Sequence, residues 1–503
     1  MARSGSPRFI FRSWGAHYPA EDELPPRPAI VSGRLLGRTF RPLPRAVLLA
    51  ILSAGVLGCA SLATPPPSPV PPLDPAATAA RLSERRLSDG EVGQALASAG
   101  VAVPGPEEAW SLDQLAVAAW RFRGEVTGAR AALDAARAGE RVAAAKPPIS
   151  LSLTSELVTS ALGGMSPWTI ALAASQLFES HGKRRLRVER AEAETALATA
   201  DLAAAIWKVR GEVRAAWLDL ELARRESALA ETELARRKDF LAWLQTQLTL
   251  GAASRPDLLT AEADLARAAG QAELARLEIP AAENRLAAAL GLPPAAIENV
   301  RLEAPDLDSL PEPFSAEAAD ALRERAVLDR LDLHRAVSEY AAAVADLRSE
   351  TAKQFPDWTL GPGLTYDRGD RKLVLGVGLT LPRREAARAG IDRAAALVAA
   401  AGAKVEQIQA QALGQTAGAI ERYAAVRAAL FRAEQARSER GAAVANAEHR
   451  RDLGAADRGD VLTAGLVELE SRRAALAVRR TAVEALSALE QGVERPVWPE
   501  SKL

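Results

Sequence analysis

The sequence has few residues of the kinds that carry metal and covalent chemistry. Its 503 residues include one cysteine, four histidines and two methionines. A single cysteine excludes a disulfide framework within the chain, and the scattered histidines argue against a Cys/His metal site. A net charge of −1 argues against a general nucleic-acid partner. The sequence also lacks a nucleophile elbow, a phosphate loop and metal-ligand spacing, so it predicts no enzyme and no metal or cofactor.

Aromatic residues are also few, at 4%, whereas alanine, leucine, arginine and glutamate are abundant. This composition is typical of long helices and coiled coils. No proline occurs between residues 183 and 250, where apolar residues follow the three-four spacing of a coiled-coil seam. The seam residues are Ile206, Val209, Val213, Trp217 and Leu220. At about 1.5 Å per residue, a helix of this length extends on the order of 100 Å.

Two near copies of one short segment interrupt the helical pattern, at residues 250–261 and 453–464. They begin Leu250-Gly251 and Leu453-Gly454, and glycine at this position is typical of a helix end. The offset of 203 residues also relates the long helical stretches before the segments. The chain therefore contains a duplicated helix–turn–helix tip at the ends of two helices of matched length.

Each tip also carries the signal for a new helix. Ser254 and Asp457 are N-cap residues, and each is followed three residues later by a carboxylate, Asp257 or Asp460. The sequence thus predicts a helix start with a capping box in both copies.

Before each long helix the hydrophobic period changes from helical to two. Apolar residues alternate with Ser, Thr, Gly and Ala over residues 149–157, 168–175, 358–366 and 372–381. These segments predict two hairpins with one apolar and one small, polar face. The segments' length and alternation are typical of transmembrane strands, and Trp168, Trp358 and Tyr366 lie toward strand ends, where an aromatic girdle is expected. Four strands cannot close a barrel, so closure requires several chains.

The amino-terminal part predicts export and lipidation. Four arginines precede an apolar run over residues 46–58, which is too short to span a bilayer as a stable helix. The ending Gly58-Cys59-Ala60 resembles a bacterial lipobox, which implies cleavage before Cys59 and a covalent lipid, palmitate included, on that residue. A free buried thiol is the alternative. Ala60, rather than Asp, favours the outer membrane by resemblance to sorted lipoproteins. Residues 1–30 do not resemble a signal, so we expect translation to begin near Val31.

The fold class predicted is mainly α with a transmembrane β-barrel contribution, in two tandem repeats. We expect an N-terminal extension and signal peptide (residues 1–58), a lipidated Pro-rich tether (59–105), a first repeat (106–299), a connector (300–314), a second repeat (315–492) and a tail (493–503). The first repeat would have strands at about 149–177, a long helix at about 183–250 and a return helix at about 257–290. In the second, these lie at about 358–381, 384–453 and 460–491. Helical stretches over 111–145 and 315–352 precede the strands.

From residue 111 to residue 491 the chain resembles the outer-membrane factors of the TolC type. The resemblance is carried by the paired hairpins, the equal long helices, the two tips, the basic helix starts Lys183-Arg184-Arg185 and Arg383-Arg384, and the strand end at residues 377–382. It implies a homotrimer with a 12-stranded barrel in outer-membrane lipids and an α-helical periplasmic tunnel. It also implies partners: a periplasmic adaptor protein and an inner-membrane transporter of the resistance-nodulation-division or ABC type. The second repeat has some similarity to the heavy-metal cation efflux branch.

The resemblance further implies roles for the tip residues. Asp460 matches the acidic residue that constricts the periplasmic aperture, and Thr463 stands where many members have a second Asp. Asp257 and Thr260 are the equivalents in the first repeat. Three chains would bring six carboxylates to the mouth, although both aspartates also fit simple N3 positions. The expected adaptor-contact residues are Leu250, Gly251, Ser254, Leu453, Gly454 and Asp457.

Two questions stay open at this stage. The basic cluster Lys183, Arg184, Arg185 and Arg187 begins a helix, where the dipole disfavours cations, so either phospholipid headgroups or solvent would have to offset the cost. The duct could also serve type I protein secretion, or the chain could be a periplasmic coiled-coil lipoprotein scaffold without a channel. The scaffold would not explain two strand hairpins in register with the helices.

Overall fold

The computed structural model describes residues 74–105, 107–159 and 166–497. The chain divides into a first unit, Met1–Leu73, and a second unit, Asp74–Leu503. The first unit, with the predicted lipidation site Cys59, lies outside the described residues, as does the turn at Gly163-Gly164. Everything below concerns the second unit.

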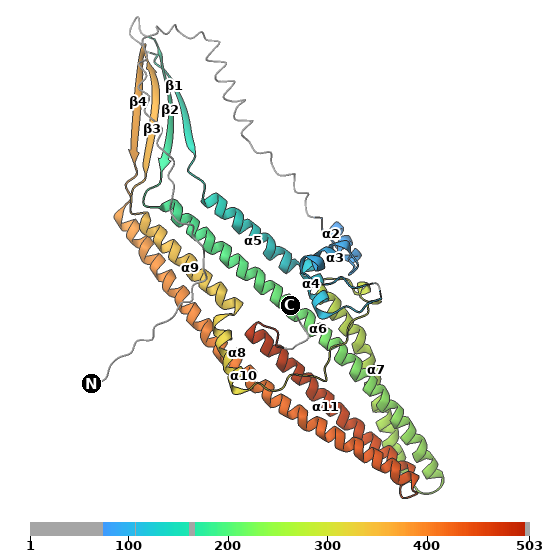
Figure 1. The fold of residues 1–503 in the computed structure, drawn as a ribbon. Helices are drawn as coiled ribbons and strands as arrows, with labels where there is room; N and C mark the ends of the chain where they lie inside the picture. Colours follow the sequence, from blue (N-terminus) through green and yellow to red (C-terminus); the bar gives the residue numbers. More distant parts are fainter. Residues whose placement is uncertain (1–73, 106, 160–165, 498–503) are drawn as a thin grey trace, which may run out of the picture. The chain divides into compact units, whose positions relative to one another are not determined.

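Two long helices dominate this unit, and each is followed by a shorter antiparallel helix (Figure 1). The long helices are α6 (Lys183–Thr249) and α10 (Arg384–Asp452), and the return helices are α7 (Arg255–Leu290) and α11 (Arg458–Val493). Both return helices have 36 residues. Matched hairpins in the two repeats are therefore confirmed.

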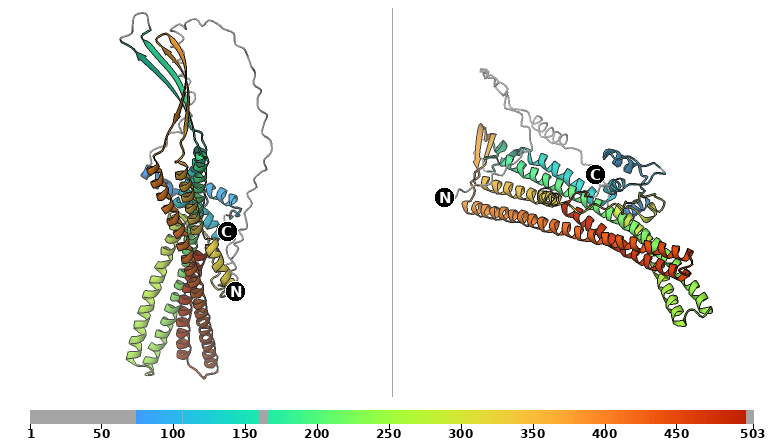
Figure 2. Two further views of the ribbon diagram at one scale, coloured as in Figure 1. Left: turned by 90° about the vertical axis from the view of Figure 1, so that its left-hand side faces the viewer. Right: turned by 60° about the horizontal axis from the view of Figure 1, so that its bottom comes forward.

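Each long helix changes its neighbours along its length. Near the sheet, α6 packs against α5 (Gly124–Ala143) and α9 (Leu331–Ala352), and toward the tips it packs against α7 and α11 (Figures 1 and 2). Similarly, α10 packs against α9 and then α11. The shorter helices thus follow one another along the long ones, which explains why the long helices do not keep a single apolar face from end to end.

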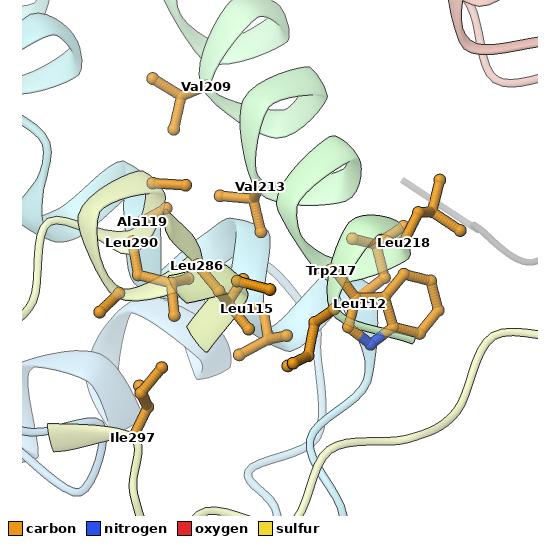
Figure 3. Packing of buried hydrophobic residues seen from close by; sticks show 14 of the residues in the cluster. Leu112, Leu115, Ala119, Val209, Val213, Trp217, Leu218, Leu286, Leu290 and Ile297 are labelled. Atoms are coloured by element: carbon orange, nitrogen blue, oxygen red, sulfur yellow. The ribbon is translucent and has the colours of Figure 1, made fainter. Parts of the chain in front are cut away.

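The remaining helices gather about midway along the long ones (Figure 1). They are α2 (Pro75–Glu84), α3 (Gly90–Ser98), α4 (Leu112–Phe122), the short 3-10 turn η1 (Pro294–Ala296) and α8 (Ala316–Leu328). The largest buried apolar cluster lies here, where Leu115 of α4, Val213 of α6 and Leu286 of α7 are all fully buried (Figure 3). The indole of Trp217 lies in the same cluster and donates to the Glu303 carbonyl at 2.9 Å, so the predicted seam residue anchors the connector between repeats.

The four strands form one antiparallel sheet in the order β1-β2-β3-β4. Their bounds are β1 Ile149–Leu157, β2 Trp168–Phe178, β3 Trp358–Asp367 and β4 Asp370–Leu379. The register places the predicted apolar residues of all strands on one face, because Leu153 pairs with Leu172, Leu172 with Leu364, and Leu364 with Leu373. Leu373 is 84% exposed. The sheet thus presents a continuous, uncovered apolar face, with β1 and β4 as its edges.

Two of the predicted helices are each broken in two. The stretch 111–145 divides into α4 and α5 at Arg123, and the stretch 315–352 divides into α8 and α9 near Arg330. Both arginines have extended backbone, with ψ of 124° and 141°. The prediction of one helix in each stretch was wrong, because the spacing of apolar residues does not reveal a single extended residue between two helices.

The side chains at these breaks explain why the breaks occur. The Arg123 guanidinium donates to the carbonyl of Ala289 at 3.2 Å, in the last turn of α7. The Arg330 guanidinium donates to the carbonyl of Gly492 at 3.0 Å, in the last turn of α11. Each arginine therefore binds the negative end of its repeat's return helix, where a cation is favoured. We call these two residues the break arginines.

Within the described ranges, none of the helices combines the length and apolarity needed to cross a bilayer.

Candidate functional site

The first tip has the geometry that its sequence predicts. Gly251 adopts φ of +70°, the left-handed conformation that ends α6, and the Ala252 N–H donates back to Gln247 at 2.8 Å. Ser254 then caps α7: its hydroxyl accepts from the Asp257 N–H, and the Asp257 carboxylate accepts from the Ser254 N–H at 3.1 Å. The capping box is therefore complete.

The second tip repeats this geometry with a different cap. Gly454 has φ of +71°, and the Ala455 N–H donates to Arg450 at 2.7 Å. The Asp457 carboxylate accepts from the Asp460 N–H at 2.8 Å, and the Asp460 carboxylate accepts from the Asp457 N–H at 3.0 Å. Both candidate aperture carboxylates thus cap helices, whatever else they do.

The two candidate aperture acids differ in their hydrogen bonding. Asp257 also accepts from the Ser254 hydroxyl at 2.5 Å. That bond, together with the bond from the Ser254 backbone, lowers the pKa of Asp257 below its ordinary value of 3.8. The cap of Asp460 is another carboxylate, so Asp460 has no such donor in its cap residue. The Ser254 hydroxyl therefore stabilises the Asp257 anion in addition to the stabilisation that any carboxylate receives at the N3 position.

The other candidate residues of the aperture lie on the exposed side of the return helices. Thr260 and Thr463 are both exposed, and the Thr260 hydroxyl donates to the Pro256 carbonyl at 3.0 Å. The structure thus places all four candidate residues in the first two turns of α7 and α11. Constriction of an aperture needs other chains and stays a prediction.

Each turn exposes a leucine side chain. Leu250 is 73% exposed and Leu453 is 69% exposed. An exposed leucine therefore stands at the matching position in both tips. Each tip thus presents one exposed leucine beside its capping residues, and contact of the candidate residues with an adaptor stays a prediction.

Sequence reasoning missed a contact that joins the hairpins near the tips. Gly459, in the first turn of α11, is buried against the indole of Trp243 on α6. A Cβ at Gly459 would lie 2.3 Å from the Trp243 ring. The first repeat has Pro256 at the matching position, so the signal available was this single difference between otherwise similar tips.

Charged residues continue this contact between repeats toward the middle of the hairpins. Glu233 of α6 is buried and pairs with Arg473 of α11 at 2.5 Å, and Asp219 of α6 pairs with Arg480 of α11 at 2.8 Å. Deeper, Arg214 and Glu490 pair at 3.1 Å with both side chains almost fully buried. The two hairpins are thus held together by ion pairs between α6 and α11.

The positive charge at the start of α6 is offset by groups of the protein itself, and not by phospholipid headgroups or solvent as the two expectations had it. Arg184 donates to the Ala144 carbonyl at 2.7 Å and Arg187 to the Ala143 carbonyl at 3.1 Å, both at the end of α5. Lys183 pairs with Asp357 at 2.9 Å. Cations that would be unfavourable at the start of α6 are favourable at the end of α5.

The candidate girdle residues lie at both ends of the sheet. Trp168 begins β2 and Tyr366 lies near the end of β3, at the same end of the sheet, whereas Trp358 begins β3 at the helix-side end. Phe178 pairs with Trp358 and is 51% exposed, so the helix-side aromatics include one that the sequence analysis did not single out. The role as a membrane girdle stays a prediction.

Among the residues that the structure describes, no group of three or more His, Cys, Asp or Glu side chains could hold a metal ion.

Comparison with known proteins agrees with this architecture. Residues 123–292 match the family described as outer membrane efflux protein. The outer membrane protein VceC from Vibrio cholerae is similar over 77% of this chain and 97% of its own, with 22% identity and a TM-score of 0.62. The outer-membrane channel OprN matches 78% of this chain and 94% of its own, with 22% identity and a TM-score of 0.63. The CmeC channel of Campylobacter jejuni covers 80% and 91%, with 15% identity and a TM-score of 0.60. No curated protein sequence matches the chain.

The fold is therefore the one found in solved outer-membrane proteins, the channel OprN among them. Residues 123–292 match the outer membrane efflux protein family, and the described part of the chain has the fold of these solved structures. That family and these neighbours are channels, not enzymes, as the sequence predicted.

Proposed function

We propose that this outer membrane efflux channel is the exit duct of a tripartite pump, which receives substrates from an inner-membrane transporter through a periplasmic adaptor. The observation that carries the proposal is the uncovered apolar face of the sheet at one end of two matched hairpins. In lipid, backbone groups along open sheet edges are costly to leave unpaired. The edges β1 and β4 therefore need partners from other copies.

Three copies would give twelve strands and six hairpins. A barrel of twelve strands leaves a passage, whereas eight strands leave an interior filled by side chains. The small residues of the polar sheet face, such as Gly361, Gly363 and Gly376, would then line the lumen. A homotrimer is therefore the smallest assembly with a usable duct.

The test of the duct is conductance. The purified full chain should form heat-modifiable trimers and open defined channels in planar bilayers. A monomer that yields no conductance steps would overturn the proposal and favour the coiled-coil scaffold. The class of transporter, resistance-nodulation-division or ABC, and the exported substrate follow from the partner and not from the duct.

The adaptor contact is proposed at the two exposed leucines. A charged side chain there would break an apolar contact but leave the left-handed glycines and both capping boxes unaltered, so Leu250→Glu together with Leu453→Glu should abolish co-purification with the adaptor while leaving trimers intact. Retained co-purification in the double variant would refute the contact.

A lipid on Cys59 is proposed from the sequence pattern alone. It requires a mature N-terminal peptide that begins at Cys59 and carries the mass of the acyl groups. An unmodified peptide spanning Cys59 would refute the anchor.

A further inference from the structure

The start of α10 differs from the start of α6 in how its cations are satisfied. At α6, arginines bind carbonyls of α5, as described above. At α10, Arg384 and Arg388 are exposed and make no hydrogen bond or ion pair within residues 74–105, 107–159 and 166–497. Glu385 stands between them in the first turn, but neither guanidinium pairs with it, so both cations near this helix start are open to an external anion.

These arginines line a cavity of about 590 Å³ beside the end of the sheet. Its other walls come from the end of β4 and the start of α10, and from the segment that follows α9. The wall residues are Leu381, Pro382, Ala387, Ile391, Gln354 and Pro356. The cavity thus combines two guanidinium groups with a mainly apolar lining.

One wall residue of the cavity, Leu381, follows the apolar residues of β4 in sequence. Leu381 continues the alternation of Leu375, Val377 and Leu379, whose partners in β3 belong to the uncovered apolar face. It is 74% exposed. A membrane that covers this face would therefore end at the level of the cavity, where lipid headgroups begin.

We propose that this cavity binds the headgroup of an anionic phospholipid from the surrounding leaflet. Arg384 and Arg388 would bind the phosphate oxygens, and the apolar wall of Leu381, Pro382 and Ile391 would contact the glycerol and the first methylenes of the acyl chains. Arginine suits this task because its planar fork matches phosphate. The inference rests on the proposed function, since it needs the sheet face to lie in lipid.

The test uses the full chain in a neutral detergent, with native mass spectrometry to count bound short-chain phosphatidylglycerol per trimer. Charge neutralisation in Arg384→Gln or Arg388→Gln should weaken binding about fivefold each, and roughly twentyfold together. Leu381→Ser should weaken binding severalfold without a change in charge. Raised salt should weaken binding to the unaltered chain, which keeps the inference testable if a variant fails to fold.

The matched control is Arg185→Gln. Arg185 corresponds to Arg388 by the 203-residue offset and is also exposed, but it lines no part of the cavity. Equal loss of lipid in this control would overturn the cavity and leave only a general charge effect. Displacement of the lipid by equimolar inorganic phosphate, or equal binding of phosphatidylcholine, would also overturn it.

Three further outcomes separate this inference from the proposed duct. If the double variant loses its trimer mass while each remaining trimer keeps its lipid, the arginines serve a second copy of the chain and the inference fails. If the double variant loses lipid binding but retains bilayer conductance, the result is the one that the inference expects, and it leaves the proposed duct unaffected. Lipid binding without any conductance in the unaltered chain would instead overturn the proposed duct.

Discussion

The two repeats share their lengths and caps but differ where they touch each other. Both long helices end in a left-handed glycine, both return helices begin with a capping box, and both return helices end on a break arginine. The differences lie at Gly459, which takes the place of Pro256, and at the helix starts, where only α6 has arginines that donate to carbonyls of a neighbouring helix. Shared features therefore set hairpin length, and divergent features set the contacts between hairpins and with the surroundings.

The largest effect should come from the shared break arginines. Arg330→Met removes hydrogen bonds from a charged donor to Gln415 and Gly492 and leaves Asp332 without its partner. We expect the free energy of unfolding to fall by roughly 2–3 kcal/mol. Arg123→Met should act in the same direction but less, because the Arg123 side chain is 19% exposed against 10% for Arg330. Urea unfolding followed by circular dichroism measures both.

The control for these variants is Arg440→Met, a substitution on the exposed side of α10. It should change the free energy of unfolding by no more than about 0.5 kcal/mol. If Arg330→Met behaves like this control, the break arginines do not hold the return helices.

A smaller effect should distinguish the two tips. In Gly459→Ala the new methyl would overlap the ring of Trp243, so we expect a loss of about 1–3 kcal/mol from overpacking. Gly465→Ala, two turns later in α11, meets no atom within 4 Å and should stabilise the chain by about 0.5–1 kcal/mol. The two variants thus have opposite expected signs in the same helix.

Removal of the indole provides the rescue. Trp243→Ala carries its own loss of packing, but in that background Gly459→Ala should cost little further stability, because the overlap is gone. A double variant in which the two losses simply add would show that Trp243 and Gly459 do not interact in the assembled protein.

Local signals explain which parts of this structure the sequence predicted. Glycine, the N-cap residues and the alternation of the strands affect only residues close to them in sequence. The tips, the hairpins and the apolar sheet face were therefore predicted from residues alone. The breaks at Arg123 and Arg330 were not, although each begins a pattern of arginine, any residue, acid and aliphatic residue, at 123–126 and 330–333. The Trp243–Gly459 contact depends on two segments more than two hundred residues apart, which periodicity cannot relate.

The smallest expected effect concerns the two tip carboxylates. Asp257→Asn keeps an oxygen that can accept from the Ser254 N–H but removes the charge that the Ser254 hydroxyl stabilises. Because the pKa of Asp257 is lowered in the folded chain, its stabilisation of the first tip is present above the ordinary pKa of 3.8 and is lost as the pH falls through the lowered value. Hydrogen exchange in the first turn of α7 should therefore be faster in Asp257→Asn than in the unaltered chain at pH 6, and this difference should close in strong acid.

Asp460→Asn is the matched variant of the second tip. Asp460 lies beside a second carboxylate, Asp457, so neutralising it also removes a repulsion between like charges. The change in exchange at the start of α11 at pH 6 should therefore be smaller than that at the start of α7. Equal changes at both tips would mean that the N3 position alone determines the stabilisation. In bilayers, reduced cation selectivity in Asp460→Asn with an intact α11 start would separate an aperture role from capping, whereas unchanged selectivity would leave Asp460 as a helix cap only.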